Sequence, residues 1–292
     1  MSLKLPKIFL DSGDPEESKK ARGLLGFLDG QTTNPSLVVK NPHIQQYLSQ
    51  GRKLTEEELL SEYKKIVGEL GKIMAGPISV EVYADWDTPA TTMLAQARDM
   101  FTWTKNAYVK FPTIPAGLEA AQQFVSEGGR VNMTLVFDQP QAAAVYSATV
   151  QTSAPAFVSP FIGRWDDRGY NGLDLVRNIL KMYRKFDQTR HTKPHVEVLA
   201  ASIRTLDHFY SSIVMGADIL TVPMSIIRDW IHQDERFMPD KHYRSTTTGL
   251  KPLVYEELSF SPDFKTYGVK SEDGSLLNEG ISKFVNDWKK LL

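Results

Sequence analysis

YVKFPTIPAGLEAAQQFVSEGGRVNMTL, residues 108–135, is the stretch that decides the fold of this chain. An apolar run at Tyr108–Phe111 predicts a strand, and Pro115 stands where a helix would begin. The Gly-Gly pair at 128–129 stops that helix before a second apolar run, Arg130–Leu135. A strand, a helix and a strand with short connections are typical of a parallel sheet.

The same alternation extends in both directions from this unit. Thr55 and Glu58 form a capping box that starts another amphipathic helix. Eight strand–helix repeats favour a closed (β/α)8 TIM barrel over an open doubly wound sheet, and 292 residues is an ordinary length for one such α/β domain. The expected strands are Lys7–Leu10, Gly30–Thr33, Ile78–Val82, Tyr108–Phe111, Arg130–Leu135, Ala156–Ser159, Val196–Ala200 and Asp218–Val222.

We expect residues 1–292 to form a single barrel domain, with 235–292 as a C-terminal helical extension. This extension begins with a polar loop, Asp240–Thr248. It ends in a helix that we expect to pack on the barrel or on a neighbouring subunit, which leaves a homo-oligomer open. The apolar face of this helix comprises Ile281, Phe284, Val285, Trp288 and Leu292.

The composition excludes several classes of function. A net charge of -1 gives no general electrostatic reason to expect nucleic acid or an anionic membrane as partner. The chain has no cysteine, which excludes disulfides, thiolate metal sites and a cysteine nucleophile. No apolar signal segment and no membrane-spanning run is present, so we expect a cytoplasmic protein. His191 and His195 have metal-like spacing, but Pro194 forbids a regular helix there, and we expect no metal.

Polar side chains occur where the predicted strands end, which is where barrel enzymes hold their active sites. Each has an ordinary structural alternative: Asp11 as a helix cap, Glu81 and Lys110 as a structural ion pair, the others as turn, capping or surface residues. One Asp, one Glu and one Lys at the same end of three strands favour a reactive site. The full set is Asp11, Thr33, Asn34, Glu81, Lys110, Asn132, Thr134, Ser159, Arg164, Ser202 and Arg204.

The lysine indicates the chemistry. An amine must lose its proton to attack a carbonyl, and burial in an apolar interior disfavours the charged form of a lysine. Tyr108, Val109, Phe111 and Pro112 surround Lys110 in the sequence and would supply that interior. A lysine nucleophile forms Schiff bases with ketones and aldehydes, and nearby carboxylates would move the protons.

Two arginines indicate the ligand. Arg164 and Arg204 follow the sixth and seventh predicted strands, near the place where barrels often hold phosphate. Guanidinium groups pair bidentately with phosphate. The residues alone therefore point to a Schiff-base lyase or transferase that acts on a phosphorylated carbonyl compound.

The chain resembles the transaldolase family along nearly its whole length. TTNPSL, SPFIGRWDD and VLAASIR in this order form a specific combination. The matching segments are FLDSGD (9–14), TTNPSL (32–37), VEVYAD (80–85), VKFP (109–112), GLEAA (117–121), VNMTLVF (131–137), SPFIGRWDD (159–167), VLAASIR (198–204) and GADILTVP (216–223), followed by a similar C-terminal segment.

The resemblance implies roles for these residues. Lys110 would form the Schiff base, Asp11 would act as acid and base at the C4 hydroxyl, and Glu81 with Thr134 would activate water. The substrate would be bound by Thr33, Asn34, Asn132, Ser159 and Phe161, and its phosphate by Arg164, Ser202 and Arg204. No metal or organic cofactor is implied.

The reaction implied is the transfer of dihydroxyacetone from sedoheptulose 7-phosphate or fructose 6-phosphate to glyceraldehyde 3-phosphate or erythrose 4-phosphate, in the non-oxidative pentose phosphate pathway. The related fructose 6-phosphate aldolases, which release the three-carbon unit, have Gln in place of Glu81 and Tyr in place of Phe161. Both positions favour the transferase. A free aldolase and a catalytically silent sugar-phosphate-binding protein are the alternatives.

Overall fold

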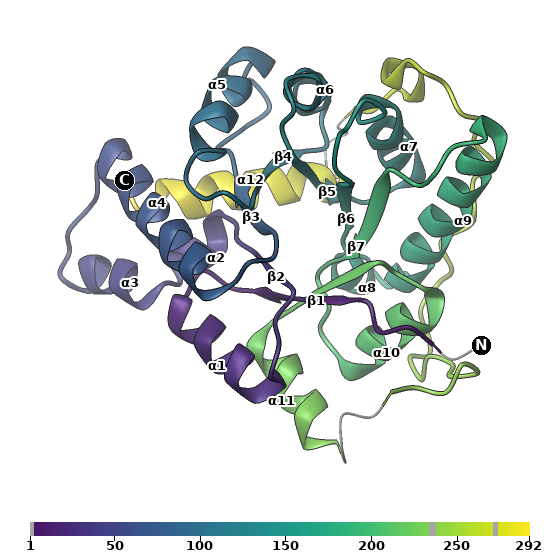
Figure 1. Cartoon of the computed structure of the whole chain (residues 1–292), viewed down its shortest axis with the longest axis horizontal. Coiled ribbons are helices and arrows are strands. Elements are labelled where there is room, and N and C mark those ends of the chain that lie inside the picture. The colour runs from purple at the N-terminus through teal and green to yellow at the C-terminus, as the bar shows by residue number, and fades with distance from the viewer. Residues whose placement is uncertain (1–2, 234–237, 271–273) are drawn as a thin grey trace.

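A closed barrel of eight parallel strands forms the centre of the protein, in the order β1 to β8 (Figure 1). The computed structural model describes residues 3–233, 238–270 and 274–292. The predicted (β/α)8 barrel is confirmed, and every predicted strand is found within two residues of its expected ends. The strands are β1 (Lys7–Asp11), β2 (Gly30–Thr32), β3 (Ile78–Glu81), β4 (Ala107–Pro112), β5 (Val131–Val136), β6 (Ala156–Pro160), β7 (Val196–Ala200) and β8 (Ile219–Val222).

Helices surround the barrel and begin and end where the sequence signals are. Thr55 and Glu58 form the predicted capping box, and Pro115 occupies a first helical position. None of the described helices is long and apolar enough to cross a membrane. The helices are α1 (Pro15–Leu25), α2 (Pro35–Val39), α3 (Pro42–Ser49), α4 (Glu56–Ile73), α5 (Ala90–Met100), α6 (Pro115–Ser126), α7 (Gln139–Ala148), α8 (Ile162–Asp166), α9 (Gly172–Arg190), α10 (Leu206–Met215), α11 (Met224–His232), the 3-10 helix η1 (Phe264–Tyr267) and α12 (Leu276–Lys289).

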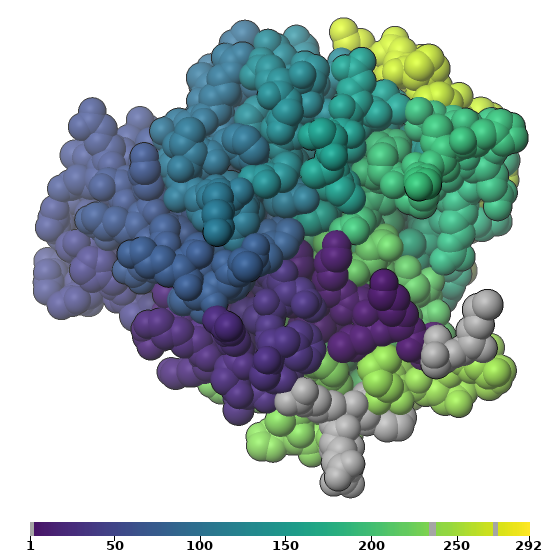
Figure 2. All heavy atoms as spheres, viewed as in Figure 1, coloured from purple at the N-terminus to yellow at the C-terminus, as the bar shows by residue number. Residues whose placement is uncertain are grey.

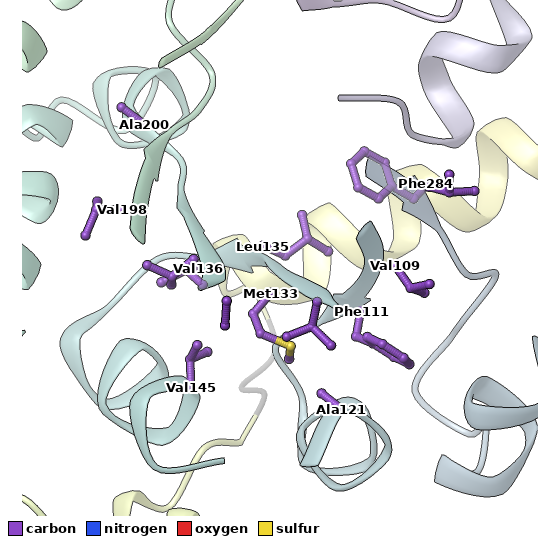
Figure 3. Close-up of a cluster of buried hydrophobic side chains, with 14 of the residues drawn as sticks. Val109, Phe111, Ala121, Met133, Leu135, Val136, Val145, Val198, Ala200 and Phe284 are labelled. Carbon is purple, nitrogen blue, oxygen red and sulfur yellow. The ribbon is translucent and has the colours of Figure 1, made fainter. Parts of the chain in front are cut away.

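Apolar side chains on the outer face of the strands build the main core. Figure 3 shows Phe111 of β4 and Met133 of β5 between the strands and Ala121 of α6. All three side chains are fully buried. Such burial removes apolar surface from water on both sides of the contact, which stabilises the barrel and its helical ring together.

The inner face of the strands is filled by aromatic rings at the amino-terminal end. Tyr108 stacks on Phe157 with ring centroids 4.2 Å apart, and Phe9 meets Phe157 edge-on at 6.0 Å. Successive side chains of a strand point to opposite faces. Residues two positions after these rings, among them Asp11, Lys110 and Ser159, therefore also face the interior, one layer nearer the barrel mouth.

The C-terminal helix α12 packs on its own barrel, against α2 and β5. It lies behind β3 to β5 in Figure 1 and is covered by other elements in the space-filling view from the same side (Figure 2). Gly280 permits this approach, since a β-carbon there would lie 2.8 Å from Leu135 Cδ2. The predicted apolar face is buried except for Leu292, which is only partly covered. Residues 235–237 and 271–273 of the expected extension lie outside the described residues.

Candidate active site

A cavity of about 270 Å³ opens at the carboxyl ends of the strands. It lies above the aromatic layer, where the alternation of side chains along the strands leaves polar groups facing inward. Seven of the predicted site residues line it: Asp11, Asn34, Lys110, Thr134, Ser159, Phe161 and Ser202.

Lys110 lies at the centre of this group. Its register neighbour on β3 is Glu81, and Lys110 Nζ lies 2.7 Å from Glu81 Oε2. The two side chains are only 5% and 4% exposed, so the ion pair is buried. Lys110 Nζ also donates to the carbonyl oxygen of Thr33 at 3.0 Å. The amine is thus held in one position by two oxygen atoms.

The two carboxyl groups near the lysine have shifted pKa values. Burial raises the pKa of Glu81, and the Lys110 ammonium offsets only part of this effect. Burial also raises the pKa of Asp11, although a hydrogen bond from Thr32 and the charge of Lys110 lower it. Thr32 Oγ1 donates to Asp11 Oδ1 at 2.6 Å. A carboxyl group with a raised pKa exchanges protons more readily near neutral pH than an ordinary one.

A buried chain of hydrogen bonds supports Ser159. Ser159 Oγ donates to Asn132 Oδ1 at 2.7 Å, and Asn132 Nδ2 donates to Ser79 Oγ at 3.0 Å. Asn132 is fully buried and is not among the residues that line the cavity. Its amide oxygen thus holds the Ser159 hydroxyl, and the substrate contact that the family resemblance implies for Asn132 stays a prediction.

The Thr134 hydroxyl is buried without a hydrogen-bond partner among the described residues, as is Glu81 Oε2 apart from its ion pair with Lys110. The register of β5 and β6 shifts between Met133 and Val136, and Leu135 has a φ of 59°, which is rare for a branched residue. Thr134 lies within this irregular stretch and lines the cavity. A hydroxyl left without a partner there is suited to hold a ligand or a water molecule.

Asn34 and Thr33 have different positions although they are adjacent in the sequence. Asn34 caps α2, because its Oδ1 accepts from Leu37 N at 2.9 Å, and it also lines the cavity. Thr33 points outward, where its Oγ1 lies 2.5 Å from Tyr63 Oη and donates to Ser79 O at 2.7 Å. The structure thus turns the Thr33 hydroxyl toward Tyr63 and brings its carbonyl oxygen to Lys110, and a role of Thr33 in substrate binding stays a prediction.

Phe161 and Ser202 line the side of the cavity formed by β6 and β7. The Phe161 ring meets Phe137 edge-on at 5.4 Å, which fixes its plane. Ser202 has a φ of 57°, in the left-handed region, and its carbonyl oxygen accepts from Gly163 N at 3.1 Å. Backbone held in this region is often found at functional sites.

The two predicted phosphate-binding arginines lie outside the cavity lining. Arg204 forms a bidentate pair with Asp167, with nitrogen–oxygen distances of 2.5 and 2.8 Å. Its side chain crosses Gly163, where a β-carbon would lie 2.4 Å from Arg204 Nε. Arg164 is half-buried in the short helix α8. The run Trp165–Gly172, which follows the sixth strand, thus supplies the carboxylate that pairs with Arg204.

Several cavity residues were not predicted from the sequence. Thr32 and Thr221 face inward beside Asp11, with their hydroxyl oxygens 2.5 Å apart. The alternation of side chains along β2 and β8 could have identified both. Lys40 and Lys283 bring two positive charges to the cavity, and no sequence signal placed α12 beside α2. Asp287 of α12 links those helices by accepting from Ser36 of α2, and it also accepts from Lys283 of its own helix at 2.8 Å.

The sequence profile of the family described as transaldolase/fructose-6-phosphate aldolase matches residues 8–292. The chain belongs to this family. The match covers all eight strands and α12, so the elements that form the cavity are family elements.

Relatives in the transaldolase/fructose-6-phosphate aldolase family include proteins named "Probable transaldolase". The one from Leptospira biflexa is 36% identical over 219 residues, which cover 75% of this chain and 87% of the relative. The one from Caldicellulosiruptor saccharolyticus is 33% identical over 240 residues, covering 80% and 96%. The one from Brucella ovis is 35% identical over 222 residues, covering 76% and 87%.

The two threonines of this family site give a matched test of the geometry. We expect Thr33→Val to lower the free energy of unfolding by about 1–3 kcal/mol, because the buried Tyr63 hydroxyl then loses the acceptor of its hydrogen. Thr134→Val removes a hydroxyl that has no partner, so stability stays the same or rises slightly. Urea denaturation of both variants measures this difference. A larger loss for Thr134→Val than for Thr33→Val would contradict the positions assigned to the two hydroxyls.

Proposed function

We propose that this protein is a transaldolase that transfers a dihydroxyacetone unit between sugar phosphates through a Schiff base on Lys110. One observation carries the proposal: in a chain of the transaldolase/fructose-6-phosphate aldolase family, Lys110 lines the barrel cavity. Its Nζ lies 2.7 Å from Glu81 Oε2. Asp11 lines the same cavity. The family narrows the reaction to C–C bond chemistry at a carbonyl, and the lysine supplies the nucleophile.

The first step is attack of Lys110 on the C2 carbonyl of a ketose phosphate. Glu81 accepts the proton that the ammonium must lose, which removes two opposite buried charges at once. Its raised pKa favours this transfer, since burial disfavours the carboxylate. Loss of water from the adduct then gives the iminium. Ser159 and Asn34 hold the hydroxyls of the three-carbon unit, and Asn132 keeps Ser159 in place.

The second step breaks the bond between C3 and C4. Asp11 takes the proton of the C4 hydroxyl, the aldose phosphate leaves, and the bonding electron pair moves to the iminium nitrogen to form an enamine. When an acceptor aldose phosphate binds, the enamine carbon attacks its aldehyde carbon. Asp11 returns the proton to the new hydroxyl, so that it begins and ends the cycle in the same state.

The last step is hydrolysis of the new Schiff base. Glu81 and Thr134 hold and activate the water molecule that attacks the iminium carbon. The unpartnered hydroxyl of Thr134 supports this role, because a bound water would satisfy it. Product ketose leaves and Lys110 is restored. Lys283 and Phe284 of α12 line the same cavity, which limits the entry of other water to the enamine.

Two positions favour transfer over release of free dihydroxyacetone. Position 81 is Glu and position 161 is Phe in this chain. The fructose 6-phosphate aldolases that it resembles have Gln and Tyr at these two positions. A tyrosine hydroxyl at position 161 would be able to protonate the enamine, and a phenylalanine ring cannot. A transaldolase of this kind would act in the non-oxidative pentose phosphate pathway, and we propose that the protein does so in the cytoplasm.

Triose phosphate release from fructose 6-phosphate tests this function. We expect release only when erythrose 4-phosphate is present, because Phe161 cannot protonate the enamine. A coupled assay that follows NADH measures the release with and without the acceptor. Release without acceptor would make the protein an aldolase, and an absence of release under both conditions would contradict the proposed substrates.

Arg204→Ala tests where the substrate phosphate binds. The exposed Arg204–Asp167 pair contributes little to stability, so a phosphate can replace Asp167 at the guanidinium. We expect the variant to raise KM about tenfold or more for phosphorylated donors with a small change in kcat, as measured by steady-state kinetics. Lys283→Ala is the comparison. If it raises KM while Arg204→Ala does not, the phosphate binds at α12 instead.

A further inference from the structure

A second cavity lies away from the barrel mouth, between α9, α10 and the loop of residues 243–245. Its volume is about 370 Å³, within the range of small-molecule sites. It shares no lining residue with the catalytic cavity. The proposed reaction makes no use of it, so it needs an explanation of its own.

The cavity carries a concentration of positive charge. Arg177, Lys181 and Arg184 follow one another at spacings of four and three along α9, which places them on one face of the helix. Arg244 approaches from the loop on the other side. None of the lining residues is acidic, although the whole chain has a net charge of only -1. Like charges at these spacings destabilise a helix unless an anion neutralises them.

Within the described residues, these four cationic side chains have few anionic partners. Arg177 pairs with Asp174 of the preceding turn, and Lys181 lies over the ring of Tyr255 at 3.7 Å from its centroid. Arg244 donates to two carbonyl groups of its own loop. Arg184 makes no hydrogen bond or ion pair within the described part of the chain. Its charge acts to lower the pKa of Asp218, although burial raises that pKa overall.

A buried hydroxyl group gives a second, independent indication of a ligand. Ser211 of α10 lies in the cavity wall and is 4% exposed. Its Oγ has no hydrogen-bond partner in the described structure. Buried polar groups are normally paired, and each exception calls for a reason such as an absent ligand. Leu180, Val214 and Met215 add an apolar surface beside it.

The loop that closes the cavity is held in place by Asp207 of α10. Tyr243 Oη donates to Asp207 Oδ1 at 2.7 Å, and Ser245 Oγ donates to Oδ2 at 2.5 Å. Burial raises the pKa of Asp207, but these bonds and others from the loop lower it to about 2. The carboxylate is therefore charged at neutral pH. It keeps Arg244 opposite α9, so the basic cavity is formed before any ligand binds.

We propose that this cavity binds a phosphorylated small molecule with at least two negative charges. The phosphate oxygens are bound by Lys181, Arg184 and Arg244, and Ser211 donates its hydroxyl hydrogen to one of them. The apolar surface contacts the organic part of the ligand. Guanidinium groups favour phosphate because they offer paired donors in one plane. This binding site is independent of the reaction assigned to Lys110.

Calorimetric titration with inorganic pyrophosphate tests the proposal on the full chain. We expect saturable binding to the wild-type protein in about 0.1 M salt and an affinity at least about tenfold lower for the double variant Lys181→Gln/Arg184→Gln. The matched control is Lys20→Gln/Lys53→Gln, which removes the same charge from exposed positions on and after other helices. We expect its affinity to equal that of the wild type.

Ser211→Ala distinguishes binding of pyrophosphate in a formed site from a general attraction of the anion to positive charge. We expect it to weaken pyrophosphate about two- to fivefold with no change in net charge. Absence of binding to the wild-type protein at millimolar pyrophosphate would overturn the proposal. So would equal affinities for the wild type and Lys181→Gln/Arg184→Gln, because the anion would then bind elsewhere, including the catalytic cavity.

Discussion

The buried pair of Lys110 and Glu81 is the interaction on which the site depends. Two charges that are 5% and 4% exposed are costly to remove from water, and the cost is offset only when each has a close partner. The parallel register of β3 and β4 makes these residues direct neighbours. The Thr33 carbonyl oxygen adds a second acceptor for the amine. Under the proposed function, a lysine held in this way needs to pass only one proton to Glu81 to become a nucleophile.

The barrel creates this environment by dividing its interior into layers. Aromatic rings, among them Phe157, fill the amino-terminal layer and exclude water from below. Side chains two residues further along each strand form the polar layer above. Helix α12 then lies against β5 at the barrel mouth, and Asp287 links it to α2 through Ser36. Lys110 therefore faces a small aqueous space surrounded by protein, where proton transfers are controlled by a few fixed groups.

Much of the fold and of the site was predictable from the sequence. Strand periodicity located all eight strands, and polar residues at their ends identified the cavity. The positions that the sequence did not predict have a common physical cause. The end of a strand defines which residues lie near the barrel mouth. Whether a side chain points into the barrel or away from it depends on the alternation of side chains along the strand and on hydrogen bonds with other elements. Thr33 faces Tyr63 for this reason, and Thr32 faces Asp11. Tertiary contacts such as that of Lys283 with the cavity have no local signal.

Chemical trapping of Lys110 tests the central claim most directly. Incubation with fructose 6-phosphate and borohydride should reduce the iminium to a stable secondary amine. We expect peptide mass spectrometry to find one reduced adduct on Lys110, carrying either the six-carbon donor or its three-carbon unit. Activity should fall in proportion to labelling, and a Lys110→Met variant that is otherwise folded should carry no adduct. An unlabelled Lys110 in active protein, or an adduct on another lysine that accounts for the inactivation, would contradict the Schiff-base account.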